Sequence, residues 1–272
     1  MTKGSDHRSR IKWFATQAQM PVMFVGHGSP TNAVEDNEFT RTWHQLGREM
    51  PRPRAILCIS AHWYPRRVAV TTSSKPRTIH DFYGFQEELY NTFYAPPGWP
   101  DSAHEVSALA PDVPLEFERD RGLDHGVWTV LRKMYPEADI PVSQLSIDRE
   151  RYPSFHYQLG RQLAPLREEG VLIIGSGNLV HNLRAADWNK EDGYDWAEHF
   201  DEVLAERILA GDHASLMNYA ELGEEATMAI PIEDHYLPLL YVLGASNPRD
   251  EIRFFNEHVV MGSVSMRGVL MS

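Results

Sequence analysis

Short apolar runs and longer amphipathic stretches alternate along the chain, and this alternation predicts its secondary structure. Short runs rich in apolar residues, which are typical of buried strands, predict β-strands over residues 21–26, 55–60, 68–72, 142–147 and 171–175. Apolar residues with helical spacing predict helices over residues 39–50, 103–110, 126–135, 153–169, 194–210 and 235–244. Pro51 and Pro136 follow two of these helices directly and end their patterns.

Strands that alternate with helices imply repeated strand–helix–strand units. We therefore expect an α/β fold: a single domain with a mostly parallel central sheet flanked by helices. No repeat or linker divides the chain, so we expect one catalytic domain over residues 20–272, preceded by a polar N-terminal extension over residues 1–19. In such sheets, ligands bind beyond the carboxyl ends of the strands, and that edge is where a site is expected.

Charge and composition narrow the choice of partner and compartment. The formal net charge is −12 at pH 7, whereas nucleic-acid-binding proteins carry basic surfaces, so we expect no nucleic-acid partner. No apolar stretch is long enough to span a membrane, and the first residues lack the apolar core of a secretory signal. The single cysteine, Cys58, allows no intrachain disulfide, which predicts a cytoplasmic protein. The sequence does not indicate the oligomeric state of the protein.

Histidines follow three of the predicted strands, at His27, His62 and His181. The carboxyl ends of parallel strands share one edge of a sheet, so we expect these three imidazoles to lie close together. His125 and His235 stand at the predicted starts of helices and are further candidates. Neutral imidazole is the commonest metal ligand, and catalytic sites gather ligands from well-separated segments. The pattern therefore favours a metal site, although any one histidine alone more often caps a helix or bonds to the backbone.

Rival catalytic motifs are incomplete or missing. The segment after His104 lacks the second histidine of HExxH, and the glycine-rich turns lack the third glycine of a dinucleotide fingerprint. No GxSxG elbow and no GxxxxGK[ST] loop occurs, which leaves Ser29 or Ser176 as a minor nucleophile alternative. Three aromatic residues near the histidines either line a slot for a flat substrate or, as is commoner, simply pack: Trp63, Phe82 and Tyr236.

Six motifs stand in an order and spacing that resemble a known family: GHGSP, SAHW, IHDFYGF, LDHGVW, GSGNLVHNL and EDHYLPLLYVLGA. From about Met20 to the C-terminus, the chain resembles the 4,5-DOPA extradiol dioxygenase family, which belongs to the class III extradiol ring-cleavage dioxygenases. The resemblance implies an α/β fold and one bound metal. It also implies that O2 opens the ring of a catechol such as L-DOPA to a muconate semialdehyde.

The resemblance also implies roles for individual residues. The expected metal ligands are His27, His62, His181 and His235. His125 is implied as the acid–base residue, and His181 is open to either role, ligand or base. Ring-cleaving iron enzymes usually combine two histidines with one carboxylate, whereas this chain offers His235, with Glu233 and Asp234 close by. Four imidazoles suit Zn²⁺ as well as Fe²⁺, and Fe²⁺ is the ion that the chemistry requires.

Two other functions use the same histidines. A zinc-dependent hydrolase or lyase would activate water at the cluster without consuming O2. A non-catalytic metal-binding domain would keep the cluster without turnover. The presence of His125 beside the expected ligands favours an enzyme over the second alternative, and the six motifs favour the dioxygenase over both.

Overall fold

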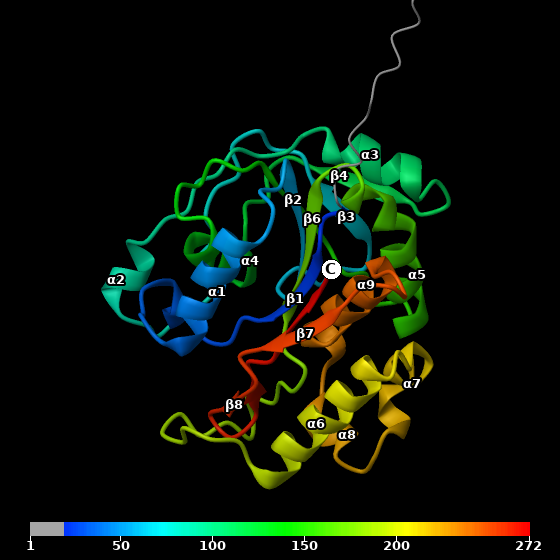
Figure 1. Cartoon of the computed structure of the whole chain (residues 1–272). Coiled ribbons are helices and arrows are strands. Elements are labelled where there is room, and N and C mark those ends of the chain that lie inside the picture. The colour runs from blue at the N-terminus through cyan, green and yellow to red at the C-terminus, as the bar shows by residue number, and fades with distance from the viewer. Residues whose placement is uncertain (1–18) are drawn as a thin grey trace, which may run out of the picture.

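The computed structural model describes residues 19–272, so the extension predicted for residues 1–19 lies outside the described residues apart from Gln19. Its main feature is an eight-stranded sheet with strand order β4-β3-β5-β2-β6-β1-β10-β7 (Figure 1). These strands are β1 (Val22–Gly26), β2 (Ala55–Ser60), β3 (Val68–Thr71), β4 (Leu115–Glu118), β5 (Val142–Leu145), β6 (Val171–Gly177), β7 (Ile252–Phe255) and β10 (Gly268–Met271). A second, two-stranded sheet pairs β8 (Val259–Val260) with β9 (Val264–Ser265).

The centre of the sheet is parallel, as the sequence predicts. Strands β1, β6, β2 and β5 are consecutive parallel neighbours, and β3 pairs in parallel with β4. Antiparallel pairing occurs where β3 joins β5 and where β10 and β7 extend the sheet beyond β1. The carboxyl ends of β1, β2 and β6 therefore lie at one edge of the sheet, which is the edge where the sequence places histidines.

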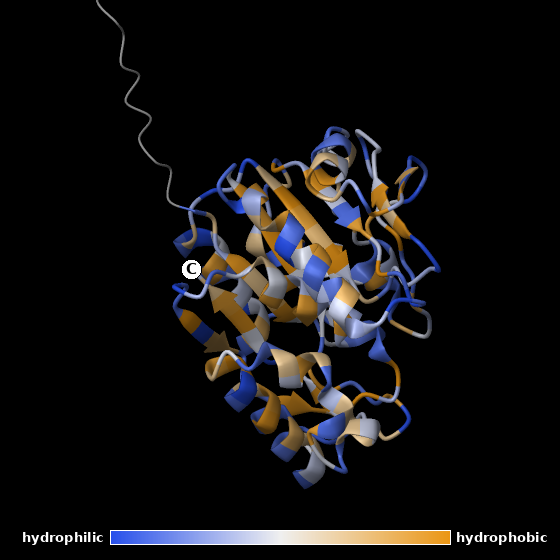
Figure 2. Ribbon diagram, turned by 90° about the vertical axis from the view of Figure 1, so that its right-hand side faces the viewer, coloured by the Kyte–Doolittle hydropathy of each residue, from blue (hydrophilic) through white to orange (hydrophobic). Residues whose placement is uncertain are grey.

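Helices cover both faces of the sheet (Figure 1). They are α1 (Glu38–Glu49), α2 (Glu87–Tyr90), α3 (Ser102–Leu109), α4 (His125–Met134), α5 (Pro153–Leu163), α6 (Asp195–Leu209), α7 (His213–Met217), α8 (Ala226–Ala229) and α9 (Leu237–Ala245). Successive strand residues point to opposite faces: Met23 packs in a cluster with Trp43 of α1 and Trp128 of α4, whereas Phe24 packs with α5 and α9. Figure 2 shows hydrophobic strands enclosed between these layers.

Two of the predicted helices differ from their predicted bounds by more than one residue. The helix predicted over residues 153–169 ends at Leu163 and continues as a 3-10 turn, Ala164–Arg167. Pro165 explains why the helix ends here. Its backbone nitrogen carries no hydrogen to donate to the preceding turn, and its ring clashes with that turn. The helix predicted from residue 235 begins at Leu237, so His235 lies in the preceding 3-10 turn, Glu233–His235. Within residues 19–272, no helix is long and apolar enough to cross a membrane.

Candidate metal centre

All five candidate histidines line one cavity at the carboxyl edge of the sheet. His27 follows β1, His62 follows β2 and His181 follows β6. His125 begins α4, and His235 ends the 3-10 turn that precedes α9. The sequence therefore correctly predicts that these side chains come together. The cavity has a volume of about 480 Å³, which is ample for a single-ring aromatic molecule.

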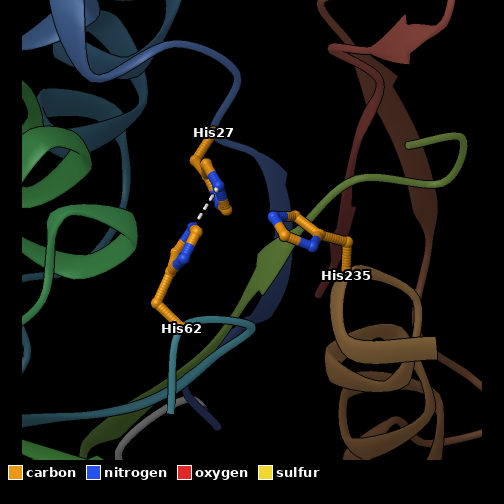
Figure 3. A group of neighbouring side chains, drawn as sticks. All are labelled: His27, His62 and His235. Atoms are coloured by element: carbon orange, nitrogen blue, oxygen red, sulfur yellow. Dashed lines mark hydrogen bonds between the residues drawn. The ribbon is translucent and has the colours of Figure 1, made fainter. Parts of the chain in front are cut away.

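Three of these imidazoles converge on a common point. His27, His62 and His235 each offer one ring nitrogen, and these nitrogens lie within 4.8 Å of one another (Figure 3). The Nε2 atoms of His27 and His62 are 3.0 Å apart. Nitrogens that share a tetrahedral metal at a bond length near 2 Å are separated by about 3.3 Å. The spacing in this cluster therefore fits a single ion held by three histidines.

In His27 and His235, a polar partner at Nδ1 leaves Nε2 free to face the point of convergence. The hydroxyl of Ser176 donates to the carbonyl of Gly126 and so accepts from Nδ1–H of His27, 3.0 Å away. Nδ1 of His235 lies 3.0 Å from a carboxylate oxygen of Asp234, which can only accept. Both rings therefore carry their proton on Nδ1 and present the Nε2 lone pair, as metal-binding histidines do.

Burial keeps the imidazoles neutral, which is the state that binds a metal. Burial and the surrounding imidazoles hold the pKa of His27 and the pKa of His235 well below the ordinary histidine value. Burial, followed by the charge of His125, lowers the pKa of His62 to about 3. Burial lowers the pKa of His181 to about 4. At neutral pH, protons therefore do not compete for these nitrogens.

Acidifying the metal-free protein is expected to destabilise it between about pH 6.5 and pH 4. An unfolded histidine titrates near 6.5, whereas the folded pKa is about 3 for His62 and about 4 for His181. Within that window the unfolded chain binds more protons, so the free energy of unfolding falls as the pH falls. Thermal melting across this range measures the effect, and His181→Ala is expected to show a shallower decline. A melting temperature that is constant or rises on acidification would contradict the expectation.

His181 lies beside the three converging histidines and outside their group. Its ring stacks on that of His235 with a centroid distance of 3.5 Å and an interplanar angle of 11°. Together with Asp234 and His235, it forms a second set of potential ligand atoms within 4.8 Å. The roles predicted for His181, fourth ligand or base, both remain predictions.

His125 is also next to the three-histidine group without belonging to it. Its ring centroid lies 3.9 Å from that of His62 and 5.6 Å from that of His27. The side chain is 7% exposed, and its Nδ1 lies 3.0 Å from a carboxylate oxygen of Asp81. This position suits a residue that exchanges protons with a bound substrate. Sequence reasoning overlooked Asp81, although the motif IHDFYGF contains it.

Close backbone packing explains two glycines in the motifs. A Cβ on Gly177 would lie 2.0 Å from the carbonyl oxygen of His235, so only glycine lets β6 approach that turn. A Cβ on Gly126 would lie 2.6 Å from the Ser60 hydroxyl and 3.0 Å from the His62 ring. The first turn of α4 can therefore pack directly against the end of β2, which brings His125 to His62.

Aromatic and apolar side chains form the walls of the cavity. Phe82, Tyr83 and Phe85 line one part of it, and Trp188 and Leu183 contribute elsewhere. Tyr83 is 92% exposed and Trp188 is 63% exposed, so both stand near the opening. Of the three aromatic residues considered for this lining, Phe82 lines the cavity, whereas Trp63 and Tyr236 are buried and do not line it.

Imidazoles that converge in an aromatic-lined cavity at the carboxyl edge of an α/β sheet form a cluster able to bind a metal ion. A family model described as the catalytic LigB subunit of aromatic ring-opening dioxygenase matches residues 17–266. The chain belongs to this family. The family that the six motifs indicate is thereby confirmed, and the protein is a ring-opening dioxygenase, an oxidoreductase.

Individual relatives agree with this membership. The chain is 46% identical to "4,5-DOPA dioxygenase extradiol" of Escherichia coli K12, over 93% of this chain and 95% of that one. It is 37% identical to the protein of the same name from Beta vulgaris, over 83% of this chain and 86% of the relative. The crystal structure of an uncharacterised Escherichia coli K12 protein matches with a TM-score of 0.83 and 40% identity, covering 93% and 100% of the two chains.

Proposed function

We propose that this enzyme opens the ring of a catechol beside its hydroxyls, using O2 and Fe²⁺, and that L-DOPA is a substrate. The product would be a muconate semialdehyde. The main support is the convergence of three neutral imidazoles on one point of an aromatic-lined cavity. The names of the relatives support the same reaction and substrate.

The residues take complementary parts in this reaction. His27, His62 and His235 would hold the ion, with His181 as a fourth ligand or as a base. Fe²⁺ held there would supply Lewis acidity toward the catechol hydroxyls and a route for electrons from the ring to O2. His125 would take a hydroxyl proton at Nε2, because its Nδ1 faces Asp81, and would return that proton during ring opening.

The cavity favours a planar aromatic substrate. Phe82, Phe85 and Trp188 line it and would exclude water from the ring during the reaction. Among the described residues that line the cavity, none is a lysine or an arginine. We therefore expect that none of these lining residues clamps a substituent of the ring as a lysine or arginine would.

Anaerobic reconstitution with Fe²⁺ is expected to give an enzyme that consumes O2 when a catechol is added. An oxygen electrode and the absorbance of the semialdehyde measure the reaction, and one O2 should disappear per ring opened. The Zn²⁺-loaded protein is the matched control and should be inactive, because zinc does not change its oxidation state. Substrate breakdown without O2 uptake would instead support the zinc hydrolase or lyase.

We also propose that the partners are limited to the small aromatic substrate and O2, and that the enzyme works in the cytoplasm. The net charge of −12 speaks against a nucleic-acid partner. Cys58 is buried in β2, and burial raises the pKa of its thiol well above the ordinary value. This thiol is therefore unreactive, which suits a structural residue in a reducing compartment.

A further inference from the structure

Asp81 touches two of the histidines at the site, although the motifs give it no role. It lies in the loop between β3 and α2, and its side chain lines the cavity with 25% of its surface exposed. One carboxylate oxygen, Oδ1, accepts a hydrogen bond from the backbone N–H of His125 at 2.9 Å and lies 3.0 Å from Nδ1 of the same residue. The other oxygen, Oδ2, lies 3.9 Å from Nδ1 of His62.

We propose that Asp81 is a positioning residue that fixes the tautomer and orientation of the His125 imidazole, and this proposal rests on the proposed function. An ionised carboxylate only accepts hydrogen bonds, so the nitrogen that faces it must carry the proton. With the proton on Nδ1, the lone pair of His125 lies on Nε2 and can accept a proton from the substrate. In this structure Nδ1 lies 3.0 Å from Oδ1 of Asp81, at hydrogen-bond distance but not aligned for a hydrogen bond.

The backbone contact of Asp81 gives this arrangement its rigidity. His125 is the first residue of α4, where backbone N–H groups have no partner within the helix. The residue before it, Asp124, makes no capping hydrogen bond with its side chain, and Asp81 supplies an acceptor from a loop 44 residues away. The same oxygen thus anchors the main chain and faces the ring of His125.

Asp124 is the neighbouring carboxylate, and its contacts exclude it from this role. It is fully buried, and Oδ1 accepts from the hydroxyl of Ser60 at 2.7 Å. Oδ2 accepts from the side chain of Gln144 and pairs with Arg121 at 3.1 Å. Both oxygens of Asp124 are therefore engaged by groups other than the His125 ring, which leaves Asp81 as the carboxylate that this ring faces.

The tautomer of His125 tests the proposal without relying on turnover. In ¹⁵N NMR spectra of the Zn²⁺-loaded full chain, the wild-type His125 ring is expected to carry its proton on Nδ1, with His125→Ala used to assign the signals. In Asp81→Ala the Nε2–H form is expected to become major, and in Asp81→Asn the Nδ1–H preference is expected to weaken. Asp139→Asn, which removes an exposed carboxylate paired with Arg52, serves as the control. The same tautomer in wild type and both Asp81 variants would overturn the proposal.

Steady-state kinetics of the Fe²⁺-loaded enzyme give a second readout. Groups that orient a site residue typically contribute 10–100-fold, so kcat is expected to fall by about tenfold in Asp81→Asn and about a hundredfold in Asp81→Ala. KM should stay within about twofold, and metal content should stay unchanged, because the substrate and ion contacts remain. In a His125→Ala background, Asp81→Asn should cause no further loss, since it acts through that ring.

The alternative results are distinct from one another. Equal losses from Asp81→Asn in the wild-type and His125→Ala backgrounds would overturn the proposal, and so would loss of the metal, which would make Asp81 a ligand. Asp81, His62 and His125 offer atoms within 4.8 Å, so metal content is a necessary measurement. If the wild-type enzyme consumes no O2 with any catechol, the proposed function fails, while the NMR result still decides the role of Asp81.

Discussion

Replacing His27 by alanine is expected to abolish metal binding and ring opening together. Its Nε2 lies 3.0 Å from that of His62, and its proton is held on Nδ1 by Ser176. Removing this imidazole leaves two of the three converging nitrogens, which is too few to retain an ion firmly in a site with positions open for substrate. Metal content should fall from about one ion per chain to background, and oxygen uptake should fall with it. His62→Ala and His235→Ala should behave in the same way.

Metal analysis of each purified variant beside its oxygen uptake measures this loss. His199→Ala is the matched control, because this histidine is 64% exposed on α6 and pairs with Glu225. His181→Ala separates the two roles predicted for that residue: a ligand loses the ion, whereas a base keeps the ion and loses turnover. Full metal content in His27→Ala would show that the ion binds elsewhere and would overturn the proposed ligand set.

The sequence predicted the central strands of the sheet more completely than the strands at its two sides. Strands buried on both faces form nearly continuous apolar runs, and for this reason β1, β2 and β6 were recognisable. β4 has a partly exposed pattern, Leu115–Glu118, that contains two glutamates, and no helix separates β7 from β10. A pattern based on strand–helix–strand units therefore did not predict β4 at one side of the sheet or the antiparallel strands β7 and β10 at the other.

The histidines of the site were predictable, whereas the groups that orient them were not. A histidine at a strand end has its position fixed by the strand, and parallel strands deliver such residues to one edge. Ser176 orients His27 across 149 residues of chain, and Asp81 reaches His125 across 44. Such contacts depend on how loops pack in three dimensions, and neither spacing nor periodicity along the chain encodes that packing.

Replacing His125 by alanine is expected to preserve the metal and remove most of the turnover. The ring lies beside the three-histidine group, lines the cavity and faces Asp81 through Nδ1, which leaves Nε2 for proton transfer. General acid–base groups typically contribute about 10²–10⁴-fold, so kcat should fall by a factor in that range while metal content stays near one ion per chain. Oxygen-uptake kinetics and metal analysis on the same preparation measure both quantities.

Three outcomes distinguish the possible roles of His125. Loss of metal and activity together would make it a ligand, against its place outside the converging group. If the free energy of unfolding falls by about 0.5–2 kcal/mol and activity stays normal, the role of His125 is to stabilise the N-terminus of α4 and nothing more. That outcome would end the proton-transfer assignment. His125→Gln sharpens the comparison, because glutamine can fill much of the same space and form hydrogen bonds but cannot serve as a base near neutral pH. A large loss of kcat in both variants, with the metal retained, is therefore the result that proton transfer by this imidazole requires.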